Sequence, residues 1–318
     1  MKMNELRVFG IPWHTAHQYE LSKLFKSFDL LTNIYREWGT VSRPIPDNMK
    51  MVIEFDRSKY DLAILHIDQQ CLDPRIGKGR LFRDMKELTE GMPRVVINHM
   101  TPFDDKLEEE QVIAGIKAEV GDIPMIVNSQ TARAQWGWGH PIIHGLTASE
   151  WWDLPKEPRI ITSLSAGGMN KAYGRELLHV TMQLLNESGI ELIWLQTMHK
   201  CNTWDEYREY IGRSLVYFNP TLNSPMPRSR TEAMLSGACI VSTGTQDWDR
   251  YIEDGVNGFI IPWNPNAAAK LLTRLVTTDI KLAREVGQRG KKMAMERLSH
   301  ERWAKDWETL LSEIGVVS

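Results

Sequence analysis

The feature that most constrains the fold is a repeated alternation of short, continuously apolar runs with stretches of helical periodicity. The clearest run is Asp61–Asp68, with the sequence DLAILHID, and similar runs lie at Pro93–Asn98 and Leu215–Phe218. A run of this length without polar alternation predicts a strand that is buried on both faces of its sheet. Because helical segments separate these strands, we expect an α/β fold with parallel sheets covered by helices.

Chain length and a central proline-rich segment indicate two domains. The chain has 318 residues, enough for two domains that each bury a core of their own. Residues 146–158, with the sequence LTASEWWDLPKEP, contain two prolines and no strand pattern, as is typical of an interdomain linker. We therefore expect a first domain over residues 1–150 and a second over residues 151–299.

Charge and cysteine content narrow the class of protein. A net charge of −3 gives no general attraction to nucleic acid or to anionic membranes. The three cysteines are scattered, which predicts neither a disulfide framework nor a zinc cluster and fits a reducing compartment. No apolar run is long enough to span a bilayer, and Glu5 interrupts the stretch that a signal peptide would need. We expect a cytoplasmic protein.

Polar residues follow the first predicted strand. Gly10 ends the strand at residues 6–9, and a helix is expected near residues 16–28, because Leu21, Leu24, Phe25 and Phe28 share one face at helical spacing. His14 and His17 lie in the loop and helix start after the strand. In open α/β sheets ligands bind at the carboxyl ends of the strands, so this loop is expected to face a cleft. The two histidines are candidates to bind a hydroxyl or phosphate, or else cap the helix. Two histidines alone make a poor metal site.

A second polar pair follows the central strand of the first domain. His66 and Asp68 are two residues apart and therefore point to the same side of a strand. They are candidates for a base and the residue that orients it, or for a structural hydrogen bond at the strand end.

The second domain contains a strand–loop–helix segment suited to anion binding. The helix is expected to begin at Pro227, because a first helical residue needs no N–H, and to end at Gly237. Arg228, Arg230 and Glu232 lie at its start. A loop that leads into a helix beside strand ends is a common site for a diphosphate.

A glycine-rich loop lies earlier in the second domain, between a strand at 159–163 and a helix at 174–186. Gly167 and Gly168 allow close backbone approach to a phosphate, and Lys171 supplies a positive charge. Its spacing fits neither the triphosphatase phosphate loop nor the dinucleotide fingerprint. The segment is therefore either a phosphate loop or a turn without a ligand.

The order of these features resembles the retaining glycosyltransferases of the GT-B fold, in particular the hexosyltransferase family with the glycosyltransferase group 1 signature. PRSRTEAMLSGACIVST at 227–243 looks like that signature, and YIEDGVNGFIIPWNPNAAAKLL at 251–272 matches the pattern downstream of it. IIHGL at 142–146 and INHM at 97–100 look like first-domain segments of the family. The resemblance implies two Rossmann-like domains that face a cleft. It also implies that residues 300–318, with Trp303 and Trp307, cross back onto the first domain.

The resemblance also implies roles for individual residues. Glu232 matches the glutamate that accepts hydrogen bonds from the ribose hydroxyls, which suits a carboxylate with two oxygens; the alternative is an ion pair with Arg228 one turn away. His99 matches a residue near the transferred sugar, and Ser224 stands where the family has a sugar-binding glutamate. The residues expected to bind the donor nucleotide are Gly10, Gly168, Lys171, Arg175, Arg228, Thr231 and Glu232. Those expected to contact its sugar are Ser224, Met226 and Pro227.

The implied activity is transfer of a sugar from a nucleotide-diphosphate donor, UDP-sugar favoured, to a hydroxyl acceptor with retention of configuration. Fixed cations and helix-start amides would stabilise the leaving diphosphate, so neither a metal nor another cofactor is expected. Ser224 in place of the acid leaves inversion open, and that reaction would need a base such as Asp68 or His99.

Other activities fit the same fold. They are a nucleotide-sugar epimerase or hydrolase, a DNA-base-modifying glucosyltransferase, and a binding module without activity. The acceptor is a small molecule, a saccharide, a protein or a modified DNA base.

Overall fold

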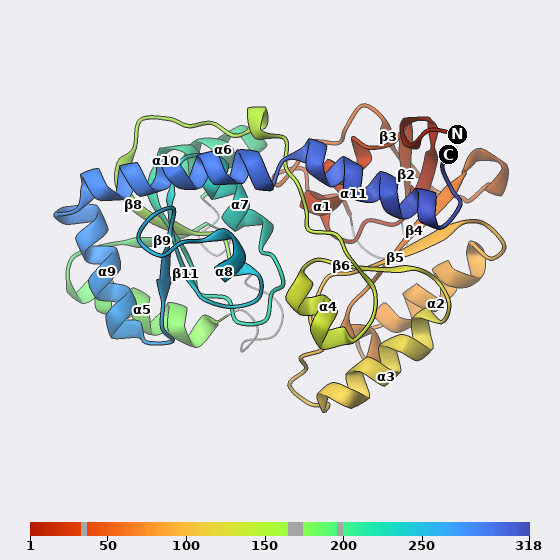
Figure 1. The fold of residues 1–318 in the computed structure, drawn as a ribbon, viewed down its shortest axis with the longest axis horizontal. Helices are drawn as coiled ribbons and strands as arrows, with labels where there is room; N and C mark the ends of the chain where they lie inside the picture. The colour runs from red at the N-terminus through yellow and green to blue at the C-terminus, as the bar shows by residue number, and fades with distance from the viewer. Residues whose placement is uncertain (33–36, 165–173, 196–199) are drawn as a thin grey trace. The chain divides into compact units, whose positions relative to one another are not determined.

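The computed structural model describes residues 1–32, 37–164, 174–195 and 200–318, which form two compact α/β units (Figure 1). Unit 1 comprises Met1–Gly145 and Glu301–Ser318, and unit 2 comprises Leu146–His300. The division falls at 145/146, ahead of the boundary expected at 150/151. Leu146 belongs to unit 2 because its backbone hydrogen-bonds with Leu298 and His300.

Unit 1 is built on a parallel sheet with the strand order β3-β2-β1-β4-β5-β6-β7 in its described residues. The strands are β1 (Arg7–Gly10), β2 (Ser27–Leu31), β3 (Met49–Val52), β4 (Leu62–Ile67), β5 (Arg94–Asn98), β6 (Met125–Val127) and β7 (His140–Pro141). The helices are η1 (Met3–Glu5), α1 (Thr15–Ser22), η2 (Arg57–Lys59), η3 (Gln69–Leu72), α2 (Lys78–Leu88), α3 (Glu109–Val120), α4 (Gln130–Trp136) and α11 (His300–Glu313).

Helices cover both faces of this sheet, because successive residues of each buried strand enter different cores. Val8 of β1 packs in the core that α1 and α11 complete, whereas Phe9 packs in the core with α2, α3 and α4. β4 alternates in the same way, with Ile64 on the α1 side and Leu65 on the other. This explains the continuously apolar run from which the strand was predicted.

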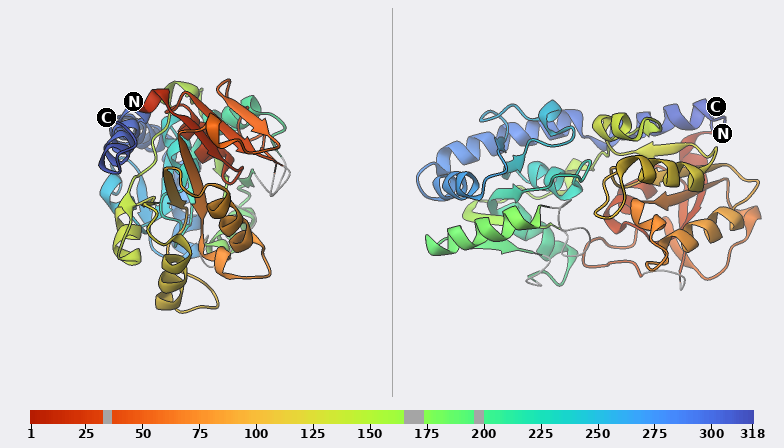
Figure 2. Two further views of the ribbon diagram at one scale, coloured as in Figure 1. Left: turned by 90° about the vertical axis from the view of Figure 1, so that its right-hand side faces the viewer. Right: turned by 90° about the horizontal axis from the view of Figure 1, so that it is seen from below.

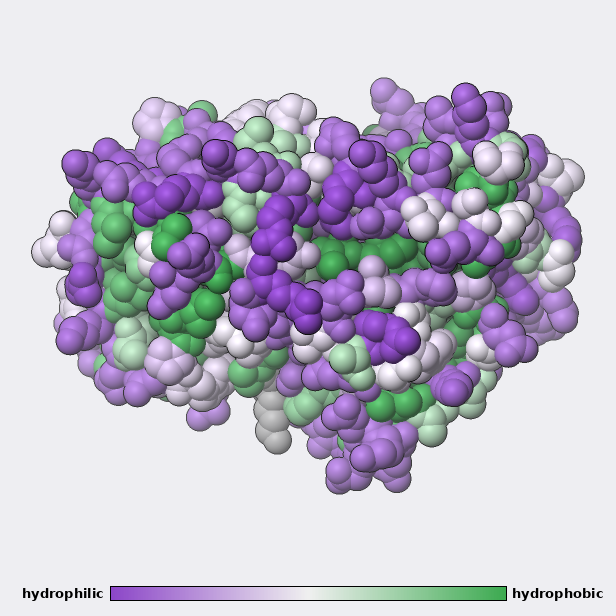
Figure 3. Space-filling model, viewed as in Figure 1, coloured by the Kyte–Doolittle hydropathy of each residue, from purple (hydrophilic) through white to green (hydrophobic). Residues whose placement is uncertain are grey.

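The C-terminal helix α11 packs on unit 1, as expected. Trp303 and Trp307 are almost completely buried in the α1-side core, and Arg302 donates hydrogen bonds to the carbonyls of Ile143 and His144. Its solvent side carries Glu301, Lys305 and Glu308, and the surface over this helix is mainly hydrophilic (Figure 3). Both chain ends lie beside each other in unit 1 (Figure 2), where the Ser318 amide donates to the Met1 carbonyl.

Unit 2 is built on a second parallel sheet with the order β12-β11-β10-β8-β9 in its described residues. The strands are β8 (Glu157–Thr162), β9 (Leu192–Trp194), β10 (Ser214–Asn219), β11 (Cys239–Thr243) and β12 (Phe259–Ile261). The helices are η4 (Ala148–Glu150), α5 (Arg175–Glu187), α6 (Trp204–Arg213), α7 (Arg228–Leu235), α8 (Trp248–Tyr251), α9 (Pro265–Thr277) and α10 (Ile280–Arg297).

Two glycines lie at the ends of helices α5 and α7 in unit 2. Gly237 follows α7 with a φ of 75°, and a Cβ there would lie 2.6 Å from the Asp153 carboxylate. Gly174 precedes α5 with a φ of 66°, and a Cβ there would lie 1.7 Å from the Pro220 carbonyl oxygen. Gly174 is therefore in direct contact with Pro220 in the loop after β10, and only glycine fits the approach.

Three local expectations need correction. The helix predicted to run to Phe28 ends at Ser22, because Phe28 belongs to β2 and is completely buried in the sheet core. Helix α3 was not predicted. Pro227 is the residue before α7 rather than its first helical residue, since its ψ of 115° is not helical.

No helix in the described ranges combines the length and the apolar character that a bilayer crossing requires.

Candidate functional site

Each sheet has a point where successive strands leave in opposite directions, and ligands of open α/β sheets bind at the carboxyl side of such a point. In unit 1 it lies between β1 and β4, since β2 and β3 extend one way and β5 to β7 the other. In unit 2 it lies between β8 and β10, since β9 lies on one side and β11 on the other. Most of the predicted site residues that the structure describes lie at or next to these two places.

A chain of hydrogen-bonded hydroxyls crosses the β8–β10 edge of unit 2. The Tyr217 hydroxyl of β10 lies 2.7 Å from Ser229 Oγ on α7 and 3.0 Å from Ser163 Oγ, just after β8. Tyr207 Oη on α6 lies 3.5 Å from Ser163 Oγ and donates to Glu232 Oε2 on α7 at 2.7 Å. Four elements of unit 2 are thereby joined around one carboxylate.

Glu232 is the acidic centre of this network and is only 2% exposed. A buried carboxylate is stable only when hydrogen-bond donors surround it, and Tyr207 supplies one of them. Each carboxylate oxygen accepts more than one hydrogen bond, so the pair can also receive two neighbouring hydroxyls of a ligand. This geometry is compatible with the predicted ribose contact.

Arg230 is a feature of unit 2 for which the sequence predicted no separate role. Its guanidinium is 1% exposed, stacks 3.7 Å from the Trp248 ring centre, and makes two 3.4 Å contacts, to Ser242 Oγ and Met226 Sδ. Burial lowers its pKa to about 9, against the opposing effects of Tyr217 and Asp247. A cation held under the start of α7 adds positive potential at the edge where an anion would bind.

The remaining predicted residues of unit 2 occupy the same edge in part. Arg228 and Thr231 are buried in α7, Met226 is buried just before it, and Ser224 is half-buried in the loop after β10. Arg175 is the first residue of α5. Gly168 and Lys171 lie outside the described residues.

In unit 1, histidines gather at the β1–β4 edge. His66 at the end of β4 is 2% exposed, and its Nδ1 lies 2.9 Å from Nε2 of His99, which directly follows β5. His14 stacks on His99 with ring centres 5.5 Å apart, and His17 meets His99 edge-on at 5.2 Å. Burial, and to a smaller extent His14, lowers the pKa of His66 to about 3, so His66 is neutral at physiological pH.

Gly10 and Asp68 have structural surroundings in unit 1. A Cβ on Gly10 would lie 3.1 Å from the Ile64 carbonyl, so the glycine allows β1 to pack closely against β4. Asp68 accepts from the Gln70 amide at 3.0 Å and forms a buried ion pair with Lys78.

The base-and-orienter pair of His66 and Asp68 is not formed. The two ring nitrogens of His66 face Gln18 and His99 instead.

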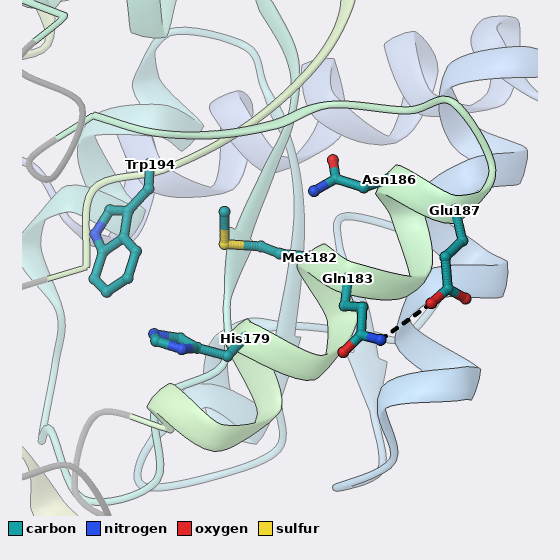
Figure 4. Close-up of a pocket in the computed structure, with 6 residues that line it drawn as sticks. All are labelled: His179, Met182, Gln183, Asn186, Glu187 and Trp194. Atoms are coloured by element: carbon teal, nitrogen blue, oxygen red, sulfur yellow. Dashed lines mark hydrogen bonds between the residues drawn. The ribbon is translucent and has the colours of Figure 1, made fainter.

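Neither unit presents a metal site in its described part, where no three histidine, cysteine or acidic residues are arranged to hold an ion. A separate pocket of about 580 Å³ lies on unit 2 between α5 and the edge strand β9 (Figure 4). It is lined by His179, Met182, Gln183, Asn186, Glu187 and Trp194. None of the residues predicted from sequence lines it.

The chain was compared with protein families, with curated sequences and with solved structures. Residues 175–278 match the family model described as glycosyl transferases group 1. A search of curated protein sequences gives no match. HepE (Alr3699) of Anabaena, solved with UDP and glucose, is 13% identical, with a TM-score of 0.69 and coverage of 97% of this chain and 100% of that one.

Two further solved structures are similar. Sucrose-phosphate synthase of Thermosynechococcus elongatus is 14% identical, with a TM-score of 0.67 and coverage of 99% and 100% of the two chains. A TarM variant of S. aureus is 16% identical, with a TM-score of 0.59 and coverage of 78% and 55%. At these identities the likeness is one of fold. The chain therefore has the GT-B fold, and its second unit carries the sequence pattern of the glycosyl transferases group 1 family.

Proposed function

We propose that the protein is a glycosyltransferase that moves a sugar from a nucleotide-diphosphate donor, with UDP-sugars favoured, to a hydroxyl group. The observation that carries the proposal is the buried Glu232 carboxylate, held by Tyr207 at the β8–β10 edge within the segment that matches the family model. HepE, which shares the fold, has been crystallised with UDP and glucose and with UDP-glucose, which supports a UDP-sugar as the first donor to test.

In the proposed donor site, the ribose and the diphosphate of the nucleotide are bound by different groups. Glu232 accepts hydrogen bonds from the two ribose hydroxyls while keeping that from Tyr207. The amides at the start of α7, with Arg228 and Arg230 in its first turn, supply positive potential for the diphosphate. Arg175 at the start of α5 is a further candidate cation.

In the reaction that we propose, the bond from the anomeric carbon to the diphosphate oxygen breaks and a bond to the acceptor oxygen forms on the same face. The acceptor's proton passes to the departing diphosphate, so the product keeps its configuration and no separate base is needed. Negative charge grows on the diphosphate as the bond breaks, and fixed amides and cations stabilise that charge most in the transition state. No metal is required by this scheme.

Calorimetric titration of the purified protein with UDP, GDP, ADP and the corresponding glucose derivatives tests the donor site. We expect one diphosphate to bind and its sugar derivative to bind at the same site. If none of them binds at millimolar concentration, the proposal is wrong. With the bound donor, release of free sugar without any acceptor would indicate a hydrolase, and the anomeric configuration of a transfer product would distinguish retention from inversion.

A further inference from the structure

We propose that Gln18 and His66 act as positioning residues that hold His99 in one tautomer, with its proton on Nδ1 and its lone pair on Nε2 facing His66. In this state His99 is a hydrogen-bond donor at Nδ1 and not a base. The inference rests on hydrogen bonds within unit 1, and its bearing on the reaction rests on the proposed function.

The side-chain amide of Gln18 has a single possible orientation. Its oxygen accepts from two backbone amides, those of Trp13 at 2.8 Å and His14 at 3.1 Å. The side-chain nitrogen of Gln18 could not take this place, because it is itself a donor. Its nitrogen lies 2.7 Å from the carbonyl oxygen of Ile11, which can only accept. Three backbone groups of the β1–α1 loop therefore assign the amide oxygen and nitrogen, and the side chain is completely buried.

The orientation of Gln18 determines the tautomer of His66. The second hydrogen of the Gln18 nitrogen points to His66 Nε2 at 3.2 Å, so Nε2 has to be the acceptor. A neutral imidazole with its lone pair on Nε2 carries its proton on Nδ1. Protonation of Nε2 would set two N–H groups against each other in a buried site, in agreement with the low pKa of His66.

His66 in turn determines the tautomer of His99. The proton on His66 Nδ1 is donated to His99 Nε2 at 2.9 Å. The lone pair of His99 is thereby directed at His66, and the neutral ring carries its proton on Nδ1. The chain of donors runs from Gln18 through His66 to His99, and reversing any one bond leaves a buried donor facing a donor.

In the part of the chain that the structure describes, aromatic and imidazole rings pack against His66 and His99. Trp13 stacks over His66 with ring centres 6.1 Å apart, and His14 and His17 contact His99 through their rings. At this edge the Asp68 carboxylate forms an ion pair with Lys78. Lys78 also lies 5.0 Å from the centre of the Trp13 ring. Burial and hydrogen bonding thus both favour a neutral His66.

This arrangement defines what His99 offers to a substrate. A ligand atom that meets Nδ1 meets an N–H and must therefore be an acceptor, such as the oxygen of a sugar hydroxyl or of a phosphate. In the proposed transfer reaction His99 positions such an oxygen and takes no proton from the acceptor hydroxyl. The inverting scheme, which needs a base at this edge, does not use His99.

Long-range ¹H–¹⁵N spectra of histidine-labelled protein test the assignment directly, because protonated and unprotonated ring nitrogens have widely separated shifts. The variants His66→Gln and His99→Gln identify which signals belong to these two residues. We expect both rings to carry the proton on Nδ1 at pH 7. We also expect both to keep that state as the pH falls to 6. His99 with its proton on Nε2, or charged at pH 7, would overturn the proposal.

Substituting Gln18 shows whether it sets the state. In Gln18→Glu the oxygen that replaces the amide nitrogen, protonated toward the Ile11 carbonyl, accepts from His66 Nε2–H, so His66 and His99 should both move their protons to Nε2. In Gln18→Met, of similar size, the single tautomer should give way to a mixture. Far-UV circular dichroism and amide spectra establish that each variant is folded, and unchanged tautomers in folded Gln18→Met would contradict the role of Gln18.

Kinetics separate this inference from the proposed function. We expect kcat/KM of the wild type to lack a histidine inflection from His99, and Gln18→Glu to gain one between about pH 6 and 7. Absence of glycosyl transfer under all conditions would overturn the proposed function, while the wild-type spectra would still decide the tautomers.

Discussion

The two strand-end sites of this protein use opposite chemistry on the same scaffold. At the β8–β10 edge of unit 2, the buried Glu232 carboxylate accepts a hydrogen bond from Tyr207, and the buried Arg228 and Arg230 lie in the first turn of the same helix. At the β1–β4 edge of unit 1, neutral histidines are held in a directed chain that starts at Gln18. In the functions that we propose, charge selects the ligand in unit 2, whereas the placement of single protons selects it in unit 1.

Acid should destabilise unit 1 through His66 and thereby distinguish it from unit 2. The folded pKa of His66 is about 3 and the unfolded value is 6.5, so only the unfolded chain gains this proton in between. Stability from this residue is complete above pH 6.5 and falls by up to about 1.4 kcal/mol per pH unit below it. Hydrogen exchange of β4 amides between pH 7.5 and 5 measures the loss. His66→Gln should show a shallower dependence, and an equal slope in both proteins would refute the assignment.

Gly174→Ala should damage unit 2 and spare unit 1. The added Cβ would lie 1.7 Å from the Pro220 carbonyl oxygen, at a backbone conformation that alanine disfavours. We expect the free energy of unfolding to fall by roughly 3 kcal/mol or more, and nucleotide binding to be lost. Thermal unfolding measures the loss of stability. The matched control is Gly189→Ala, where φ is 72° and nothing lies within 4 Å, so only about 1 kcal/mol is expected. Equal losses in the two variants would show that the contact with Pro220 is unimportant.

Substitutions in the carboxylate network should weaken donor binding without loss of fold. Glu232→Gln removes the charge that receives hydrogen bonds, which is worth roughly 1.5–3 kcal/mol or about a 10- to 100-fold rise in Kd. Tyr207→Phe removes one neutral donor and should cost about 1 kcal/mol. Calorimetry with the best-binding nucleotide measures both, and Glu285→Gln on the exposed side of α10 is the control. Unchanged affinity in Glu232→Gln would remove this residue from the site.

The smallest effect is expected at Ser224, the position at which the sequence resemblance predicts a sugar-binding glutamate. Ser224→Glu places a carboxylate in the half-buried loop after β10, beside the start of α7. We expect a change in preference among donor sugars of at most about tenfold, or 1.4 kcal/mol, with little change in affinity for the free diphosphate. Competition assays with several UDP-sugars measure it. A large loss of diphosphate affinity instead would place Ser224 on the phosphate rather than on the sugar.

The strands were predicted well because burial on both faces leaves a direct mark on sequence. Continuous apolar runs located β4, β5 and β10 to within two residues. The helix after β1 was extended too far, because Leu24, Phe25 and Phe28 keep helical spacing although Phe28 belongs to β2. Periodicity records which residues are buried and does not say which element buries them.

Site residues could be predicted where they lie in a continuous sequence motif, and not where tertiary packing brings them together. Glu232 lies in a motif that is continuous in sequence, so its position could be recognised from neighbouring residues. Tyr207 and Gln18 carry no such pattern, because only tertiary packing brings α6 to α7 and α1 to the end of β4. The pairing of His66 with Asp68 was proposed from spacing alone, and it fails because closer partners occupy both ring nitrogens.

The position of α11 has a consequence for synthesis on the ribosome. Unit 1 begins the chain, yet Trp303 and Trp307 complete its α1-side core only after all of unit 2 has been made. Unit 2 is contiguous and can fold without α11, while the nascent unit 1 presents an apolar face that α1 covers only in part. Chaperones that bind exposed apolar surface are therefore expected to engage the early part of this chain until its last helix emerges.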